Sequence, residues 1–326
     1  MTALLIDGRA VSMQLRQELT AELEHLATMG IVPSLATIHV GGDAGAAVYQ
    51  QALQAYCEKL GLGYRHVAFP SQAEAGEVLA CVRELNANEE VSGVLPLRPF
   101  PDVSLEREVL AALDVRKDVD CLHPWSLGEL ALGRPTFVSA TPAACMELLD
   151  HHLRLQGLDP DTGFEGASFC VVGRSSSVGR PLALLALNRN ATVTIVHTGT
   201  GRAGTLATHT SGADYLVVAA GVPGFIGAEH VKPGSVVLDV GINQVWSCPH
   251  CGYADRNPEG PCARCGGDLD GAESSIVGDV RFDEVREKAA AVSPVPGGVG
   301  AVTNAMLARN VIRAAAALRR AGEREG

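Results

Sequence analysis

The sequence predicts an α/β protein of two domains, each built on a mostly parallel β-sheet. Strand-like and helix-like segments alternate along the chain, an order that covers both faces of a parallel sheet with helices. The chain has 326 residues, of which 47% are apolar, so two domains can each bury a core. We expect one domain of residues 1–140 together with 294–326, and a second domain of residues 141–293.

The first half of the chain shows the alternation most simply. Residues 10–29 are predicted to form a helix because four apolar side chains share one face, namely Val11, Leu15, Leu19 and Leu23. The next elements are a strand at 34–42, a Gly-rich turn and helix at 41–62, a strand at 64–70, a helix at 72–87 and a buried strand at 91–101. Prolines at the end of the last strand block its continuation.

The second half contains four short strands rich in valine. They lie at 167–172, 192–197, 213–221 and 235–241, after a helix at 141–153. Short apolar strands joined by helices are typical of a doubly wound, Rossmann-like nucleotide-binding domain. A Gly-rich turn and a long helix follow at 294–321, and the wide apolar face of this helix predicts that it packs on the first domain.

Composition excludes several classes of function. The net charge of −11 disfavours non-specific nucleic-acid binding through a basic surface. The first residues lack the basic and apolar regions of a signal peptide. No apolar run approaches the roughly 20 residues of a membrane-spanning helix. We therefore expect a soluble, cytoplasmic protein with no membrane or nucleic-acid partner.

A Gly-rich strand-to-helix turn occurs at 170–187, in CVVGRSSSVGRPLALLAL. Its spacing differs from the GxGxxG fingerprint, and such a turn alone is often only a turn. The valine-rich strands on both sides favour a dinucleotide phosphate site at the helix N-terminus. The residues expected to bind the cofactor are Gly173, Arg174, Ser175, Ser176, Val178, Gly179, His197, Thr198, Ala220, Gly221, Gly241 and Ile242.

The choice of nicotinamide cofactor depends on the second strand of this domain. No Asp or Glu ends that strand to bind a ribose 2′-hydroxyl. Arg174 and Arg202 instead offer cations near the place of a 2′-phosphate, which favours NADP over NAD. Solvated surface charge is the alternative interpretation of both arginines.

The nine cysteines fall into two groups. Five occur singly and are expected to be small buried hydrophobes, namely Cys57, Cys81, Cys121, Cys145 and Cys170. The others form two CxxC pairs, which predict a closed, structural zinc site with the ligands Cys248, Cys251, Cys262 and Cys265. A redox or iron site is the alternative. The surrounding segment, 246–275, is interpreted as a zinc-ribbon insertion that caps the cofactor site or contacts a subunit or partner.

Several motifs together resemble one family. They include VGGDAGAAVY, KDVDCLHP, TPAACMELL, GRSSSVGRP, VKPGSVVLDVGIN and PVPGGVGAVTNAML, in order and over nearly the whole chain apart from roughly 246–275. These are similar to the methylenetetrahydrofolate dehydrogenase/cyclohydrolase family. The resemblance implies two domains with a cleft between them, a homodimer and a nicotinamide cofactor. It also implies oxidation of 5,10-methylenetetrahydrofolate, followed by hydrolysis of the methenyl product.

Some of the family's functional residues are present in this sequence, and others are replaced. The family places a Tyr and a Lys four residues apart on one helix face, and here these positions hold Tyr49 and Leu53. The position of a family Gln is Leu97. Asp120 matches the Asp that binds the pterin, but Cys121 follows it where Gly is usual. The remaining residues implied to bind substrate are Pro296, Gly297, Gly298 and Thr303.

These losses affect the two reactions of the family differently. Hydride transfer depends mainly on orienting the substrate against the cofactor. Hydrolysis needs a positioned polar or titratable group, which leucine cannot supply. We therefore predict a dehydrogenase whose cyclohydrolase activity is lost or weak, with Tyr49 and Asp120 as its catalytic residues. One alternative is a dehydrogenase for a different one-carbon carrier or modified pterin, in a pocket shaped by Leu53, Leu97 and Arg98. Another is a catalytically silent folate- or nucleotide-binding regulator.

Overall fold

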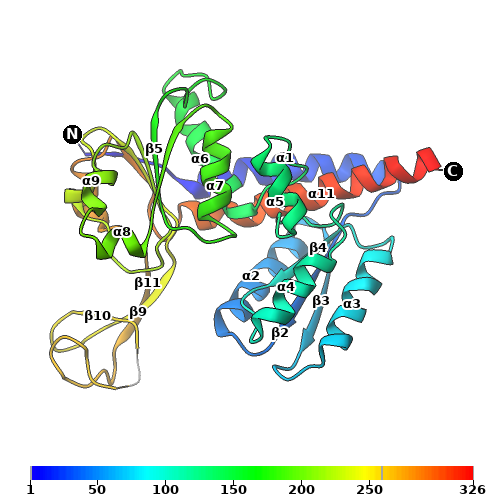
Figure 1. Ribbon diagram of the computed structural model, residues 1–326, viewed down its shortest axis with the longest axis horizontal. Helices are drawn as coiled ribbons and strands as arrows, with labels where there is room; N and C mark the ends of the chain where they lie inside the picture. The colour runs from blue at the N-terminus through cyan, green and yellow to red at the C-terminus, as the bar shows by residue number, and fades with distance from the viewer. Residues whose placement is uncertain (1, 258–259, 326) are drawn as a thin grey trace. The chain divides into compact units, whose positions relative to one another are not determined.

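The computed structural model describes residues 2–257 and 260–325 (Figure 1). The chain forms two compact units, and each contains a parallel sheet. Unit 1 comprises Met1–Val11 and Ala144–Val302, and unit 2 comprises Ser12–Ala143 and Thr303–Gly326.

Three segments lie in a different unit from the one that the sequence predicts, and the shortest is 141–143, which belongs to unit 2. Met1–Val11 belongs to unit 1, because β1 (Leu4–Leu5) pairs in parallel with β12 (Ala291–Val292). A strand of two residues has no periodic pattern by which it can be recognised. Residues 294–302 follow β12 directly and also belong to unit 1, so the turn expected in the first domain is attached to the second.

Unit 1 contains a six-stranded parallel sheet with the order β1-β12-β8-β7-β5-β6. The four predicted strands are β5 (Ser168–Val172), β6 (Thr192–Val196), β7 (Tyr215–Val218) and β8 (Val236–Asp239). The chain passes from β5 outward to β6 and then returns to β7 on the other side of β5. Ligands bind at such a switch point, beside the carboxyl ends of the strands. The prediction of a Rossmann-like domain is confirmed.

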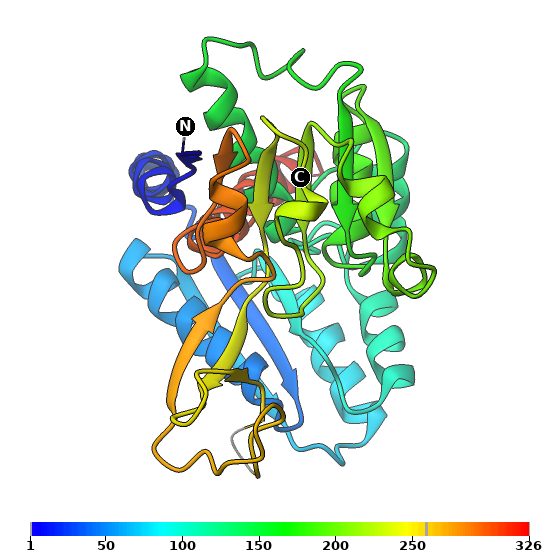
Figure 2. The same ribbon diagram turned by 90° about the vertical axis from the view of Figure 1, so that its left-hand side faces the viewer.

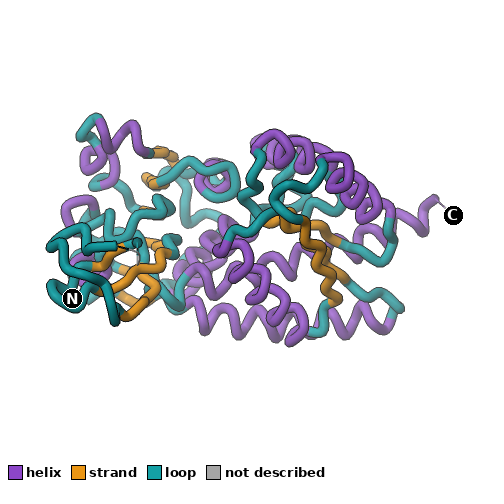
Figure 3. The backbone as a smooth tube through the Cα atoms, turned by 90° about the horizontal axis from the view of Figure 1, so that it is seen from below, coloured by secondary structure: helices purple, strands orange, loops and turns teal. Residues whose placement is uncertain are grey.

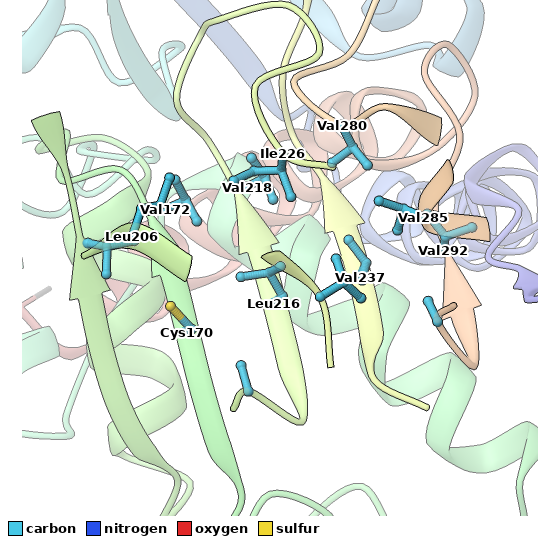
Figure 4. Packing of buried hydrophobic residues seen from close by; sticks show 14 of the residues in the cluster. Cys170, Val172, Leu206, Leu216, Val218, Ile226, Val237, Val280, Val285 and Val292 are labelled. Atoms are coloured by element: carbon cyan, nitrogen blue, oxygen red, sulfur yellow. The ribbon is translucent and has the colours of Figure 1, made fainter. Parts of the chain in front are cut away.

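Valine-rich strands supply the core of unit 1. Figure 4 shows Cys170, Val172, Leu216, Val218 and Val237 within one buried cluster. The helices of unit 1 are α6 (Ala140–Leu155, which starts in unit 2), α7 (Gly179–Leu187), α8 (Thr198–Arg202), α9 (Leu206–Thr210) and α10 (Phe282–Arg286), with a 3₁₀ turn at Ala228–His230. The prediction of single buried cysteines holds for four of five, since Cys81 is only partly buried.

Unit 2 contains a three-stranded parallel sheet with the order β3-β2-β4, with helices on both sides of the strands (Figure 3). Its strands are β2 (Ser34–Val40), β3 (Gly63–Phe69) and β4 (Gly93–Leu97). Its helices are α1 (Gly8–Thr28, which starts in unit 1), α2 (Ala44–Leu60), α3 (Ala75–Ala87), α4 (Val103–Ala112) and α5 (Pro124–Ala131). Ala36, Ile38 and Val40 of β2 pack in one cluster with α3 and α4. Thr37 and His39 therefore face the opposite side of the sheet.

The final helix, α11 (Val299–Glu325), enters unit 2 at Thr303. Its Asn310 donates hydrogen bonds of 2.8 Å to the carbonyl groups of Val119 and Val138. These bonds tie the helix to unit 2, as its apolar face predicts. Within the part of the chain that the structure describes, no helix combines the length and apolar character that crossing a membrane requires.

A separate antiparallel sheet interrupts unit 1 after β8. It consists of β9 (Asn243–Ser247), β10 (Ala254–Asp255) and β11 (Glu273–Val277), in the order β10-β9-β11. Figures 1 and 2 show that β9 and β11 form a hairpin that extends from the rest of unit 1, with the cysteine-rich segment at its far end. We call residues 248–272 the ribbon and the paired strands β9 and β11 its stem.

Candidate functional site

Helix α2 places the first two candidate residues of unit 2 on one face. The Asp43 carboxylate accepts a hydrogen bond of 2.7 Å from the Ala46 amide and caps the helix. Tyr49 and Leu53 follow one turn apart. Tyr49 is half-buried, whereas Leu53 is 1% exposed.

The Asp120 carboxyl is one of the ionisable groups whose charge acts on Tyr49, together with Cys57 and Tyr64. Its Oδ1 accepts a hydrogen bond of 2.6 Å from the Ala140 amide at the start of α6. Burial raises the pKa of this carboxyl to about 7, although the Ala140 hydrogen bond acts in the opposite direction. Burial also raises the pKa of the Tyr49 phenol above its ordinary value, and the negative charge of Asp120 raises it further. Burial therefore raises the pKa of both Tyr49 and Asp120, and the charge of Asp120 acts on the phenol.

The turn after Asp120 keeps a glycine-like backbone despite its cysteine. Cys121 has a φ of 54°, in the left-handed region that glycine adopts without strain. The Asp118 carboxylate stabilises the turn by accepting hydrogen bonds of 2.9 Å from the amides of Leu122 and His123. The substitution thus leaves the backbone path of the turn in place, at a cost of about 1–2 kcal/mol.

The second leucine is buried at the end of β4. Leu97 is 2% exposed and lies in register with His39 of β2. Leu53 and Leu97 therefore present only hydrocarbon where the family resemblance implies an ammonium and an amide. Lys59 is exposed to solvent. The Arg98 guanidinium pairs with Glu106, with an Nη2–Oε1 distance of 2.6 Å, so a carboxylate balances its charge.

A polar layer beneath α2 was missed by the sequence analysis. The hydroxyl of Thr37 hydrogen-bonds to Nδ1 of His66 at 2.8 Å and to the phenol of Tyr64 at 2.9 Å. The Gln50 amide of α2 donates to the same phenol at 3.2 Å. His39 lies on this face, is 8% exposed, and has no partner for Nε2 among the described residues. The signal was available in the alternation of β2, which places polar side chains on one face of an otherwise apolar strand.

In unit 1, packing explains both glycines of the phosphate-site turn. Gly173 has a φ of 128°, and a Cβ added there would lie 2.3 Å from the carbonyl oxygen of Ala219. A Cβ on Gly179 would lie 2.3 Å from the carbonyl oxygen of Gly173. The Ser175 hydroxyl accepts hydrogen bonds from the amides of Val178 and Gly179 at 3.1 and 3.3 Å. Ser176 lies in the same turn, three residues before the start of α7.

The candidate residues after β6 are ordered by a helix cap. Nδ1 of His197 accepts a hydrogen bond of 3.0 Å from the Gly199 amide, and Thr198 begins α8. Arg174 and Arg202 are exposed. The structure thus leaves both guanidinium groups accessible to an anion near these strand ends.

Two buried aspartates organise the ends of β7 and β8, and the sequence analysis missed both. Oδ2 of Asp279 accepts hydrogen bonds from the amides of Ala220 and Gly221 at 2.7 and 2.8 Å. Oδ1 of Asp239 accepts hydrogen bonds of 2.9 and 3.0 Å from the amides of Gly241 and Asp279. Burial raises the pKa of Asp239 to about 6, despite these backbone hydrogen bonds.

Two glycines make room for these carboxylates. A Cβ on Gly241 would lie 2.3 Å from Asp279 Cγ, and one on Gly278 would lie 1.8 Å from Asp239 Oδ2. The detectable signal was therefore the pair of DVG and GDV motifs, each placing an aspartate near a glycine.

The predicted residues Gly241 and Ile242 lie beside the predicted turn Pro296–Gly298. Together they line a hollow of about 350 Å³, all within unit 1. Side chains that the sequence analysis did not select also line it, namely Arg9, Asp239 and Ile276. Thr303, in contrast, belongs to unit 2. The same hollow is thus lined by residues predicted to bind the cofactor and by residues predicted to bind the substrate.

The four cysteines of the ribbon converge on one point. Their sulfur atoms all lie within 4.8 Å of one another. Cys248 and Cys265 have sulfur atoms 3.7 Å apart, and those of Cys251 and Cys262 are 3.8 Å apart. A disulfide needs about 2.05 Å, whereas a tetrahedral metal with thiolate bonds of about 2.3 Å needs about 3.8 Å between sulfurs. The sulfur spacing therefore matches a metal site.

Comparison with known proteins gives one consistent family for both units. Residues 6–120 match the family described as tetrahydrofolate dehydrogenase/cyclohydrolase, catalytic domain. Residues 139–319 match the NAD(P)-binding domain of the same description. The bifunctional protein FolD 2 of Rubrobacter xylanophilus is 40% identical over 328 residues, which covers 99% of this chain and 96% of that protein. The bifunctional protein FolD of Halobacterium salinarum is 41% identical, with 95% of each chain covered.

Solved structures agree with these matches. The bifunctional enzyme FolD, methylenetetrahydrofolate dehydrogenase/cyclohydrolase, of Campylobacter jejuni is 33% identical with a TM-score of 0.80, covering 96% of this chain and 98% of that one. The methylenetetrahydrofolate dehydrogenase-cyclohydrolase of Trypanosoma brucei, complexed with NADP and an inhibitor, is 32% identical with a TM-score of 0.82. That match covers 98% of this chain and 99% of the other.

Proposed function

The chain belongs to the tetrahydrofolate dehydrogenase/cyclohydrolase family, and from this premise we propose a dehydrogenase without effective cyclohydrolase activity. It oxidises 5,10-methylenetetrahydrofolate to the methenyl form with NADP, or with NAD. The observation that carries the loss of hydrolysis is the burial of Leu53 and Leu97, at 1% and 2% exposure, where the family resemblance implies Lys and Gln.

The described residues of unit 1 fit a nicotinamide dinucleotide. Gly173 and Gly179 let the backbone pack tightly where β5 turns into α7, since a Cβ on either would lie 2.3 Å from a carbonyl oxygen. The first amides of that helix are suited to a pyrophosphate. The exposed Arg174 and Arg202 support NADP over NAD, because a 2′-phosphate would gain two cations. The bound cofactor supplies the hydride acceptor, and the protein supplies position.

On the folate side, we assign binding of the pterin to Asp120 and lining of the one-carbon site to Tyr49. An ionised Asp120 accepts hydrogen bonds from the amide and amine edge of a pterin. The raised pKa of Tyr49 keeps its phenol protonated, so it remains a neutral hydrogen-bond donor. Leu53 and Leu97 exclude water from the same region. Orientation of two rings in a dry site favours hydride transfer, and neither leucine can transfer a proton.

Hydrolysis of the methenyl product requires an attacking water and a group that exchanges its protons. Neither leucine offers such a group, and Lys59 is exposed to solvent. A general acid–base group contributes roughly 10²–10⁴-fold to such a step. We therefore expect hydrolysis to fall by a comparable factor, while oxidation persists.

Two separate assays test this proposal on the purified protein. In the first, 5,10-methylenetetrahydrofolate is supplied with NADP or NAD, and reduced cofactor is measured. In the second, the methenyl compound is supplied alone, and its loss is compared with loss in buffer. We expect reduction in the first assay and no acceleration in the second. Rapid hydrolysis in the second assay would overturn the proposed loss, and cofactor binding without reduction would favour a silent regulator.

The alternative of another one-carbon carrier gains no support from Arg98, because Glu106 already balances its charge. Comparing the methylene derivative of a modified pterin in the first assay separates this alternative. The resemblance also implies a homodimer, which light scattering of the purified protein tests.

We also propose a structural zinc ion bound by Cys248, Cys251, Cys262 and Cys265. The spacing of 3.7 and 3.8 Å between sulfurs supports it. Four thiolates complete a tetrahedral shell, so no position remains for substrate. Elemental analysis of the purified protein is expected to find one zinc per chain, and serine in place of Cys251 is expected to abolish it.

A further inference from the structure

The ribbon contains two copies of the same small turn. In each, a glycine follows the second cysteine with positive φ, 69° at Gly252 and 71° at Gly266. The amide of that glycine donates a 2.9 Å hydrogen bond to the carbonyl of the first cysteine, in one copy Cys248 and in the other Cys262. Each first cysteine is buried and each second cysteine is exposed. The two turns therefore present their sulfurs to one centre in the same way.

Among the described residues of the ribbon, the apolar contacts are few, and backbone hydrogen bonds and the carboxylate of Asp255 supply the rest of its order. Its apolar cluster consists of Cys248, Cys262 and Leu269, with Ala272 packed against them. Segments of this size usually need a metal or disulfides to fold. All four cysteines are free thiols, so no disulfide replaces a metal. A metal bound by the four cysteines would therefore cross-link both turns at the far end of the stem.

The stem connects this centre to the cofactor side of unit 1. Cys248 follows Ser247, the last residue of β9, and Asn243 is the first residue of that strand. β9 pairs with β11 over its full length, from Ser247 with Glu273 to Asn243 with Val277. Five extended steps from Asn243 to Cys248 span roughly 17 Å. The stem is therefore a direct, hydrogen-bonded link over that distance.

At the base of the stem, Asn243 completes a buried hydrogen-bond network. Its side-chain amide donates to Oδ1 of Asp279 at 2.8 Å. Asp279 is 0% exposed, and its other oxygen holds the amides of Ala220 and Gly221. Displacement of Asn243 would leave a buried carboxylate oxygen without this donor, which is costly in a dry environment. The loop that follows β7 thus depends on the position of the first stem residue.

The other strand of the stem reaches the same region. Ile276 of β11 pairs with Gln244 and lines the hollow formed with Gly241 and Ile242. Both strands therefore contribute to the surface where we place the cofactor, one through a hydrogen bond and the other through an apolar side chain.

We propose that zinc in the ribbon holds Asn243 in register and that Asn243 and Asp279 position the Ala220–Gly221 loop for the dinucleotide. This inference rests on the proposed zinc site and on the proposed cofactor site. Asn243 and Asp279 act as positioning residues. Loss of zinc frays the stem and weakens cofactor binding by about tenfold, a typical size for coupling between two sites. Because such coupling is reciprocal, bound NADP raises the affinity for zinc by the same factor.

The experiment measures the Kd for NADP by calorimetry on the full chain. Zinc-loaded protein is compared with protein stripped by a chelator under reducing conditions and with stripped protein given zinc again. We expect Kd to rise about tenfold on stripping and to recover on reloading. An unchanged Kd would overturn the coupling even if zinc binds. Failure to bind zinc would instead refute the metal site, and failure to bind NADP in every state would refute the cofactor site.

Single substitutions distinguish a positioning role of Asn243 from a general effect on folding. Asn243→Ala is expected to retain zinc, to raise the Kd for NADP about tenfold, and to remove the response to stripping. Its matched control is Gln244→Ala, at an exposed position of the same strand, which keeps all three properties of the native protein. Zinc binding is also measured in Cys251→Ser, which is expected to lose the metal. Its control is Cys81→Ser, which is expected to keep the metal because Cys81 lies outside the cluster. If Asn243→Ala still responds to stripping as the native protein does, the proposed route is wrong. The positioning role also predicts a raised KM for NADP with kcat unchanged.

Discussion

The proposed cofactor region of unit 1 and the proposed one-carbon region of unit 2 depend on different kinds of chemical group. In unit 1, glycines, backbone amides and two buried aspartates shape the ends of the strands. In unit 2, we place the one-carbon chemistry on side chains, and Leu53 and Leu97 are buried at two of the positions that the family resemblance implies. A site formed by backbone groups keeps its shape as long as the glycines that allow its packing are retained. A site made of side chains can lose one reaction by two substitutions while its fold stays intact.

The largest expected effect comes from returning the missing groups to unit 2. Leu53→Lys combined with Leu97→Gln is expected to raise methenyl hydrolysis at least about a hundredfold, because an amine and an amide again face the site. Hydrolysis of the supplied methenyl compound measures the effect. A thermal melt follows the cost of burying an ammonium at a position that is 1% exposed.

The matched control for this pair is Leu53→Met with Leu97→Met, which preserves volume without adding polarity. It should show no gain in hydrolysis. If the polar pair also shows none while oxidation continues, other changes in unit 2 must contribute to the loss.

The second effect tests whether unit 1 depends on backbone. Gly173→Ala forces a Cβ to within 2.3 Å of the Ala219 carbonyl oxygen at a φ of 128°. We expect a penalty on the order of 3 kcal/mol, equivalent to about a hundredfold weaker NADP binding if it falls on the bound state. Calorimetry gives the affinity, and the melting temperature gives the share that falls on folding.

Gly201→Ala is the corresponding control, because it has open space around its Cβ and lies in α8. It should leave affinity unchanged. Equal losses in the two variants would show that the packing at Gly173 has no special role.

The third effect concerns the pH dependence of folate binding. The pKa of Asp120 is raised to about 7, so its carboxyl is mostly protonated at pH 6 and mostly ionised at pH 8. Because the ionised form accepts hydrogen bonds from the pterin, KM for the folate is expected to fall by about tenfold over this range. Asp120→Asn is expected to bind more weakly and to lose this dependence.

The same shift has a consequence of opposite sign for stability. The folded protein holds the Asp120 proton more tightly than the unfolded chain does, so this group's contribution to stability falls as pH rises from about 4 to about 7. Denaturant unfolding at several pH values should show a smaller fall for Asp120→Asn. Identical profiles would argue against a raised pKa.

The smallest expected effect is on the free energy of unfolding, at the left-handed backbone position Cys121 of unit 2. Cys121 has a φ of 54°, so Cys121→Gly should unfold with a free energy about 1 kcal/mol above that of Cys121→Ala. Denaturant titration measures the difference. No difference would mean that the turn relaxes to another conformation in the alanine variant.

Sequence patterns predicted the elements that repeat a period or a motif. The valine-rich strands, the Gly173–Gly179 turn and the cysteine pairs were all visible, since each depends on local residue types. The strand at Leu4–Leu5 was not, because two residues carry no period. Asp239 and Asp279 were also missed as functional residues, because their role depends on contacts with amides distant in the chain, such as those of Ala220 and Gly221.

The most direct test of the central claim follows both products in a single reaction. The native protein is mixed with 5,10-methylenetetrahydrofolate and NADP, and the methenyl and formyl compounds are measured alongside reduced cofactor. We predict that methenyl product accumulates one for one with reduced cofactor and that formyl product forms only at the rate of spontaneous hydrolysis. Formyl product that keeps pace with cofactor reduction would contradict the account.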